Sequence, residues 1–142
     1  MTHNALGDAP HALVVDDDAL ILMEATSILE DAGFQVLKAM NVVQALKILN
    51  QHHDAVQLLF TDVHMPGDAD GFALARHVSE HWPHIAVVVA SGQAEPGPGD
   101  LPDGATFIAK PFSAEIVRHH VRRTLPDEKH PGPLRNGNGA RN

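Results

Sequence analysis

The sequence contains no cysteine, which excludes disulfide bonds and thiolate metal sites. It has no apolar run near the roughly 18 residues that cross a bilayer, and residues 1–10 contain no hydrophobic signal core. Basic residues are few, 10 against 18 acidic ones, and a net charge of −8 argues against direct binding to nucleic acid or membrane surfaces. A cytoplasmic protein is therefore expected.

The order of the apolar segments predicts the fold. Short apolar runs alternate with segments that have apolar residues at helical spacing, and the 142 residues suffice for one domain. This alternation predicts an α/β fold, a doubly wound five-stranded parallel sheet with helices on both faces. Expected strands lie at about 11–15, 34–38, 56–61, 85–90 and 105–109. The first expected helix is capped by Asp18 and runs to Ala32, where Gly33 follows, and the second is capped by Asn41 and ends at His52-His53-Asp54. Two more helices are expected at about 71–81 and 113–125, and Ser113 can cap the last.

The alternation fails between the fourth and fifth strands. Residues 93–104 include Pro96, Pro98 and Pro102, which remove amide donors, and three glycines. We therefore expect the fourth helix to be degraded or missing. A disordered lead over 1–10, a folded domain over 11–125 and a disordered tail over 126–142 complete the predicted organisation.

Polar residues follow four of the expected strands. The first strand leads into Asp16-Asp17-Asp18, the third into Asp62 and then Met65-Pro66, the fourth into Ser91-Gly92, and the fifth into Lys110-Pro111-Phe112. In open α/β sheets, ligands bind at this carboxyl edge of the strands. Carboxylates, a hydroxyl and an ammonium group suit a divalent cation and a phosphoryl group.

Each of these elements taken alone has a structural interpretation. The three aspartates can cap a helix and complement its dipole, Asp62 can form a turn, Lys110 can be a solvated charge, and Phe107 can belong to the core. Their joint occurrence, in order and at strand ends, favours the functional interpretation.

These residues resemble the receiver domain of two-component response regulators over residues 11–125. The resemblance implies the flavodoxin-like strand order 2-1-3-4-5. It also implies that Asp62 is the phosphoacceptor, since a carboxylate can attack phosphorus and carry an acyl phosphate. A sensor histidine kinase or histidine phosphotransfer protein is the expected donor, and an unknown downstream protein reads the switched conformation. Such a module is not an enzyme, apart from self-phosphorylation and slow autodephosphorylation.

Mg²⁺ is the expected cofactor, because it takes hard oxygen ligands. The resemblance implies that Asp17 and Asp62 bind it directly with the backbone carbonyl of His64, and that Asp16 acts through water.

The remaining site residues are expected to contact or sense the phosphoryl group. Lys110 pairs with one phosphoryl oxygen as a point charge, and Ser91 donates its hydroxyl to another. Phe107 matches the family's switch aromatic, with Ser91 as its partner in the switch. A cis Lys110–Pro111 peptide bond is expected as in the family.

The chain departs from the commonest receiver pattern in two further places. The loop between Pro66 and Gly71 is one residue longer, next to the phosphorylation site. No effector domain follows residue 125, so a stand-alone receiver, or one excised from a hybrid kinase, is expected.

An aspartyl phosphatase of the haloacid-dehalogenase type is the alternative, since Asp16-x-Asp18 resembles its nucleophile and acid pair. Leu20 stands where that motif prefers threonine or valine, and no paired acids follow the fourth strand. This alternative also leaves Asp62 and Lys110 unexplained.

Eleven histidines are many for this length. His77 and His81 are four residues apart on an expected helix, with His84 close by, a spacing that can bind zinc. No acidic or cysteine partner is evident, so the spacing alone does not favour a metal site. His52-His53 and His119-His120 are expected on helix surfaces.

By resemblance, His64 and Gln93 flank the line along which water attacks the acyl phosphate, so their side chains should set its lifetime. Replacing each by alanine should change the dephosphorylation rate, measured as loss of acyl phosphate with time. Unchanged rates in both variants would refute this role.

Overall fold

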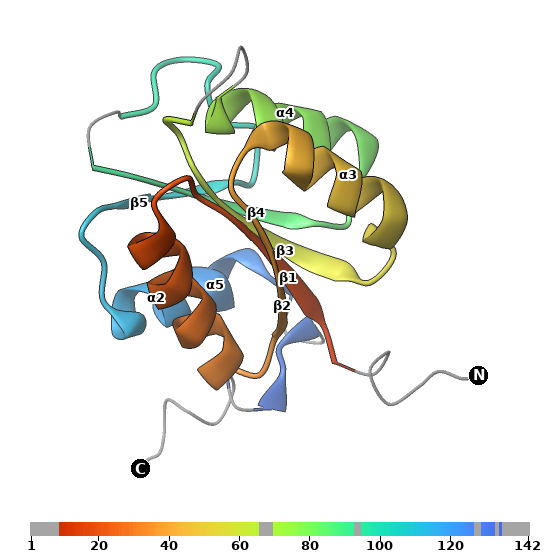
Figure 1. Ribbon diagram of the computed structural model, residues 1–142, viewed down its shortest axis with the longest axis vertical. Helices are drawn as coiled ribbons and strands as arrows, with labels where there is room; N and C mark the ends of the chain where they lie inside the picture. The colour runs from red at the N-terminus through yellow and green to blue at the C-terminus, as the bar shows by residue number, and fades with distance from the viewer. Residues whose placement is uncertain (1–8, 66–69, 93–94, 127–128, 133, 135–142) are drawn as a thin grey trace.

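A five-stranded parallel sheet with helices on both faces forms the core of the computed structural model (Figure 1). The structure describes residues 9–65, 70–92, 95–126, 129–132 and 134. The strand order β2-β1-β3-β4-β5 confirms the predicted flavodoxin-like order. The strands are β1 (His11–Val15), β2 (Gln35–Ala39), β3 (Val56–Asp62), β4 (Ala86–Ser91) and β5 (Thr106–Ala109).

The helices begin at side chains that accept hydrogen bonds from the first free backbone amides. Asp18, Asn41 and Ser113 cap their helices as predicted, and Asp70 does the same for the helix that follows it. Gly33, with φ of 103°, directly follows the residue that ends the first helix. The helices are α2 (Ala19–Asp31), α3 (Val42–His52), α4 (Gly71–His81) and α5 (Ala114–Thr124).

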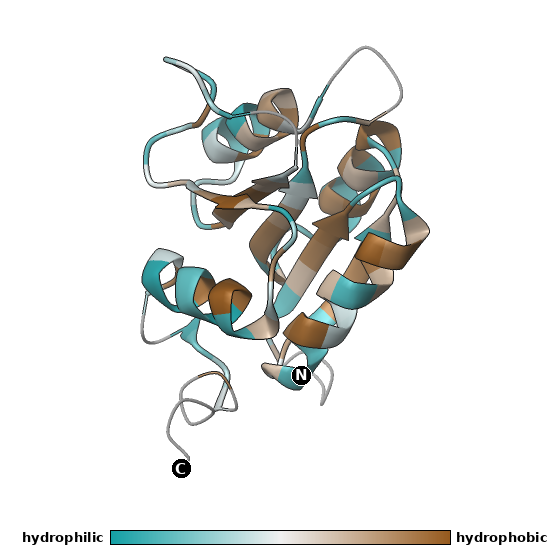
Figure 2. Cartoon of the chain, turned by 90° about the vertical axis from the view of Figure 1, so that its left-hand side faces the viewer, coloured by the Kyte–Doolittle hydropathy of each residue, from teal (hydrophilic) through white to brown (hydrophobic). Residues whose placement is uncertain are grey.

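Two hydrophobic clusters cover the two faces of the sheet. Helices α2 and α5 pack on one face, and α3 and α4 on the other (Figure 1). The strands are hydrophobic along most of their length, and the helices turn their hydrophobic sides toward them (Figure 2). Because both faces are covered, β4 is a continuous apolar run rather than an alternating one.

The connection between β4 and β5 contains no helix in its described residues, 92 and 95–105, which confirms that the fourth helix is missing. A turn closed by Asp100 takes its place: the carboxylate of Asp100 accepts from the amide of Gly97 at 2.7 Å. The Asp100 carbonyl accepts from Arg76 on α4 at 3.0 Å. Leu101 packs on the α3–α4 side of the core.

Residues 129–132 and 134, which lie in the segment predicted to be a disordered tail, pack against the fold in this structure. Nε2 of His130 donates to the carbonyls of Arg122 and Leu125, at 3.1 and 2.9 Å, where the end of α5 leaves acceptors free. Leu134 is fully buried against the core between α2, α5 and the sheet. This segment binds to the backbone carbonyls at the end of α5 and to apolar surface of the core, although its own sequence has no apolar periodicity.

Gly71, the first residue of α4, lies directly on the backbone of Asp62. Its amide donates to the carbonyl of Val63 at 2.9 Å, and a Cβ at this glycine would lie 1.8 Å from the carbonyl oxygen of Asp62. This approach holds the start of α4 against the end of β3. The expected longer loop before Gly71 falls on residues 66–69, outside the described residues.

Replacing Gly71 with alanine should therefore destabilise the fold and displace Asp62. Overpacking of this kind costs about 1–3 kcal/mol, measured as a lower free energy of unfolding in urea. Gly132→Ala is the matched control, because a Cβ there meets nothing within 4 Å. Equal stability of both variants would contradict the contact.

Candidate functional site

The carboxyl ends of β1, β3, β4 and β5 meet around one cavity of about 350 Å³. The predicted strand-end residues thus lie together, although up to 94 positions separate them in the chain. The residues that line the cavity are Asp16, Asp17, Asp18, Ile21, Asp62, His64, Ser91, Gly92 and Lys110.

Lys110 joins the ends of three strands. Its Nζ donates to Oδ2 of Asp16 and to Oδ1 of Asp62, both at 3.0 Å, and its backbone amide donates to the carbonyl of Ser91 at 3.0 Å. Burial lowers the pKa of this ammonium group, but the hydrogen bonds to the two carboxylates outweigh that effect and raise it. Lys110 is therefore a firmly charged cation. The Lys110–Pro111 peptide bond is cis, as expected.

Asp16, Asp17 and Asp62 each offer a carboxylate oxygen, and these oxygens lie within 4.8 Å of one another. Asp16 and Asp62 are buried, whereas Asp17 is exposed. Burial raises the pKa of Asp16, against the lowering effect of hydrogen bonds from the Asp18 amide and Lys110. A hard divalent cation such as Mg²⁺ fits this set of oxygens, since it neutralises carboxylates that otherwise repel one another.

The three aspartates before α2 have different roles, since one caps the helix and the other two lie in the cluster of carboxylates. Asp18 is the helix cap: its Oδ1 accepts from the amides of Leu20 and Ile21 at 2.9 and 3.4 Å. Asp16 and Asp17, together with Asp62, form the group of carboxylates that could hold a metal. The cap at Asp18 agrees with the prediction from sequence, and the roles of Asp16 and Asp17 in holding a metal stay predictions.

The remaining predicted residues occupy different places. Ser91 is buried and lines the cavity. His64 also lines the cavity but is exposed. Phe107 is half-buried on β5 and packs on the α3–α4 side of the core, and its role as the switch aromatic stays a prediction. Gln93 lies outside the described residues. Sequence reasoning missed Thr61, which is fully buried and whose hydroxyl donates to the carbonyl of Asp62 at 2.9 Å.

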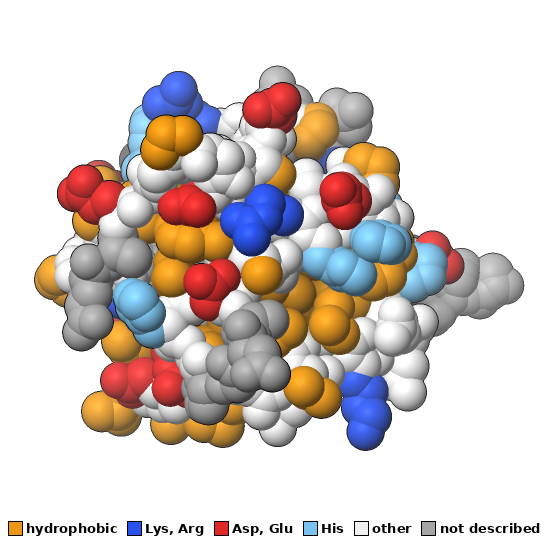
Figure 3. All heavy atoms as spheres, turned by 90° about the horizontal axis from the view of Figure 1, so that it is seen from above, with side chains coloured by type: hydrophobic (Ala, Val, Ile, Leu, Met, Phe, Trp, Pro, Cys, Tyr) orange, Lys and Arg blue, Asp and Glu red, His pale blue; other side chains and the backbone are white. Residues whose placement is uncertain are grey.

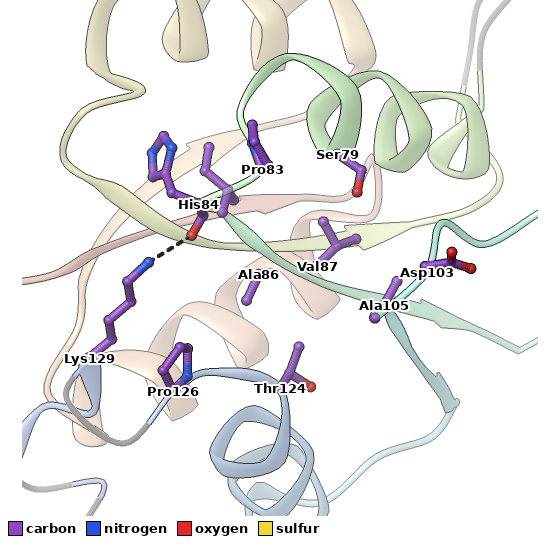
Figure 4. A pocket seen from close by; sticks show the side chains of 12 residues that line it. Ser79, Pro83, His84, Ala86, Val87, Asp103, Ala105, Thr124, Pro126 and Lys129 are labelled. Carbon is purple, nitrogen blue, oxygen red and sulfur yellow. Dashed lines mark hydrogen bonds between the residues drawn. The ribbon is translucent and has the colours of Figure 1, made fainter.

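A second cavity, of about 250 Å³, lies at the opposite ends of β4 and β5 (Figure 4). Lys129 spans its edge and donates to the carbonyl of His84 at 2.9 Å. Asp103 is the one carboxylate among the described residues that line it. Within the part of the chain that the structure describes, Asp16, Asp17 and Asp62 are the only group of three acidic or histidine residues placed to hold a metal. The first cavity is therefore the candidate site.

Comparison with known proteins identifies the family. The response regulator receiver domain model matches residues 12–122. The chain is 33% identical over 124 residues to the sensor kinase CckA of Brucella abortus, covering 84% of this chain and 13% of that kinase. It is 32% identical over 126 residues to the uncharacterized transcriptional regulatory protein YrkP of Bacillus subtilis, covering 82% of this chain and 52% of that protein.

Solved structures agree. The receiver domain of the hybrid histidine kinase CckA matches with a TM-score of 0.70 and 28% identity, over 82% of this chain and 99% of that one. The CheX–CheY–BeF3–Mg²⁺ complex from Borrelia burgdorferi matches with a TM-score of 0.71 and 25% identity, over 79% of this chain and 86% of that one.

The chain belongs to the response regulator receiver domain family of two-component signalling. Members of this family are generally regulatory rather than catalytic, and they generally bind Mg²⁺ at the acidic pocket. The chain spans 13% and 52% of the lengths of the two curated relatives above. No helix in the described residues is long and apolar enough to cross a membrane.

Mg²⁺ should stabilise the protein through the exposed carboxylate of Asp17. A ligand that binds only the folded state, present at about 100 times its Kd, stabilises by about 2.7 kcal/mol. Thermal unfolding with and without Mg²⁺ should show this rise in wild type and little of it in Asp17→Asn. Asp31→Asn, an exposed change at the end of α2, should keep the full rise. Equal rises in all three proteins would contradict the role of Asp17.

Proposed function

We propose that this chain is a phosphoacceptor module of a two-component phosphorelay, with Asp62 as the residue that carries the phosphoryl group. The observation that carries the proposal is the double contact of Lys110 with Asp62 and Asp16 beside exposed Asp17. A charged ammonium group and a cluster of carboxylates at one strand edge suit an incoming phosphoryl group with a bound cation.

The proposed step is a transfer from phosphohistidine. A carboxylate oxygen of Asp62 attacks the phosphorus, forms a P–O bond, and the P–N bond to the donor imidazole breaks. The imidazole nitrogen keeps the electron pair of that bond, so the step needs no oxidant or reductant. The product is an acyl phosphate on Asp62.

The residues around Asp62 position and neutralise the group. Lys110 already lies at hydrogen-bond distance from the Asp62 carboxylate and can move to a phosphoryl oxygen as a point charge. The Ser91 hydroxyl, on the neighbouring strand, is the second donor. Asp17, Asp62 and the carbonyl of His64 would hold Mg²⁺, with Asp16 acting through water. When bound, Mg²⁺ supplies positive charge that offsets the charge of the phosphoryl group.

The protein that donates the phosphoryl group and the downstream protein that responds to phosphorylation require separate surfaces on this domain. Leu20 and Met23, 78% and 66% exposed on α2, lie one helical turn apart beside Ile21, which lines the cavity, and offer apolar area for a kinase or phosphotransfer protein. Because no helix links β4 and β5 in the described residues, the output runs through the β4–β5 connection, Phe107 and α5 instead of a fourth helix.

The phosphatase alternative receives no support. Its acid, Asp18, is engaged as the cap of α2, and the family match includes Asp62 and Lys110 as well as the acids after β1.

Incubation with a small-molecule phosphodonor and Mg²⁺ tests the proposal. Intact-mass spectrometry should detect one added phosphoryl group in the wild type and none in Asp62→Asn, because an amide does not attack phosphorus. Asp70→Asn is the matched control, since asparagine caps a helix as well as aspartate. It should be phosphorylated like wild type.

Asp18→Asn separates the two candidate functions. A receiver keeps its covalent phosphate in this variant, whereas a phosphatase loses turnover. A phosphoryl group retained in Asp62→Asn would overturn the assignment. Transfer from a panel of phosphorylated histidine kinases would then identify the donor.

A further inference from the structure

We propose that His77 and His81 form a binding site for a divalent transition-metal ion, Zn²⁺ or Ni²⁺, at the C-terminal end of α4. The two residues lie one turn apart on this helix, and their ring centroids are 4.0 Å apart with the planes inclined by 23°. His81 is exposed and His77 half-buried, so both rings can be reached from solvent. Figure 3 shows histidine side chains gathered at one end of this face of the molecule.

The hydrogen bonding of His81 leaves a ligand atom free. Its Nδ1 donates to the carbonyl of His77 at 2.9 Å, so the neutral ring carries its lone pair on Nε2. Metal-binding histidines are commonly held in this way, with one ring nitrogen on a carbonyl and the other on the ion. The ring of His77, stacked on that of His81, supplies the second nitrogen.

Trp82 limits the movement of both rings. Its ring lies 5.8 Å from that of His77 and 5.9 Å from that of His81, and on another side it stacks on His53 at 5.5 Å. Side chains held by packing lose less entropy when they bind an ion. Trp82 also ends α4, and the negative end of the helix dipole favours a cation there.

The chemistry of the pair differs from that of the acidic site. Imidazole nitrogen prefers zinc, nickel and copper, whereas carboxylates suit Mg²⁺. The pair supplies two ligands, because no third acidic or histidine residue among those described completes it. Water fills the remaining positions. The pair lies at the opposite end of α4 from Gly71 and Asp62, so the two sites should fill independently.

Trp82 provides the probe, because it is the only tryptophan and the chain has no tyrosine. Ni²⁺ added to untagged protein should quench its fluorescence to saturation at one ion per chain, and Zn²⁺ should reverse the quenching. His77→Gln and His81→Gln should each weaken binding at least about tenfold, since even altering an outer partner of a ligating histidine commonly costs that much. Calorimetry with Zn²⁺ gives the second measurement.

His120→Gln is the matched control. On α5, Nδ1 of His120 contacts the carbonyl of Ile116 at 2.9 Å, the same bond that His81 makes, but isoleucine stands one turn earlier. This variant should bind Ni²⁺ and Zn²⁺ as wild type does.

Equal quenching and binding enthalpy in wild type, His77→Gln and His81→Gln would overturn the proposal. So would an equal loss in His120→Gln, which would indicate diffuse binding to surface histidines. In wild type, the imidazole resonances of two histidines should shift on addition of Zn²⁺. Shifts spread evenly over all histidines would also refute the site without relying on any variant.

Discussion

The contact of one ammonium group with two buried carboxylates is the interaction on which the rest of the site depends. Asp16 ends β1 and Asp62 ends β3, and neither carboxylate is well placed for burial without a cation. Lys110 supplies that cation from the end of β5, at 3.0 Å from each. The contact requires the strand order in which β3 and β4 stand between β1 and β5, so the order of the sheet is a condition for the chemistry.

The missing helix shows which parts of this fold the site requires. The strand-end residues keep their places although the connection from β4 to β5 is built from turns in its described residues. The sheet alone is therefore enough to bring Ser91 and Lys110 together, through the hydrogen bond between their backbones. What changes is the outer surface, because Arg76 and Asp100 now connect α4 to a turn rather than to a helix.

Helix α4 links two ends of different chemistry. At its first residue, Gly71 touches the backbone of the proposed phosphoacceptor, and at its last turn two histidines stack on each other beside Trp82. Hard oxygen ligands gather at one end and imidazole nitrogens at the other. A cation bound at either end would compensate part of the charge of a protein with a net charge of −8.

The sequence by itself determined what depends on neighbours along the chain. Alternating apolar patterns located the strands and helices, the side chains of Asp18, Asn41 and Ser113 marked three helix starts, and prolines excluded the fourth helix. Polar residues at strand ends then predicted the site, because parallel strands share one edge. These features follow from local hydrogen bonds and periodicity.

Only the tertiary structure decided how distant segments meet. It brought the ammonium group of Lys110 to Asp16 across 94 positions of the chain and to Asp62 across 48. It placed Gly71 on Asp62, and it packed His130 and Leu134 against α5 and the core, where sequence pattern predicted a disordered tail. It also stacked Trp82 on His53, which follows α3, and set His77 of α4 edge-on to the same ring. Such contacts depend on which polar groups lack a partner and which apolar surfaces are uncovered once the sheet and helices have packed. The pattern of neighbouring residues in the sequence does not contain that information.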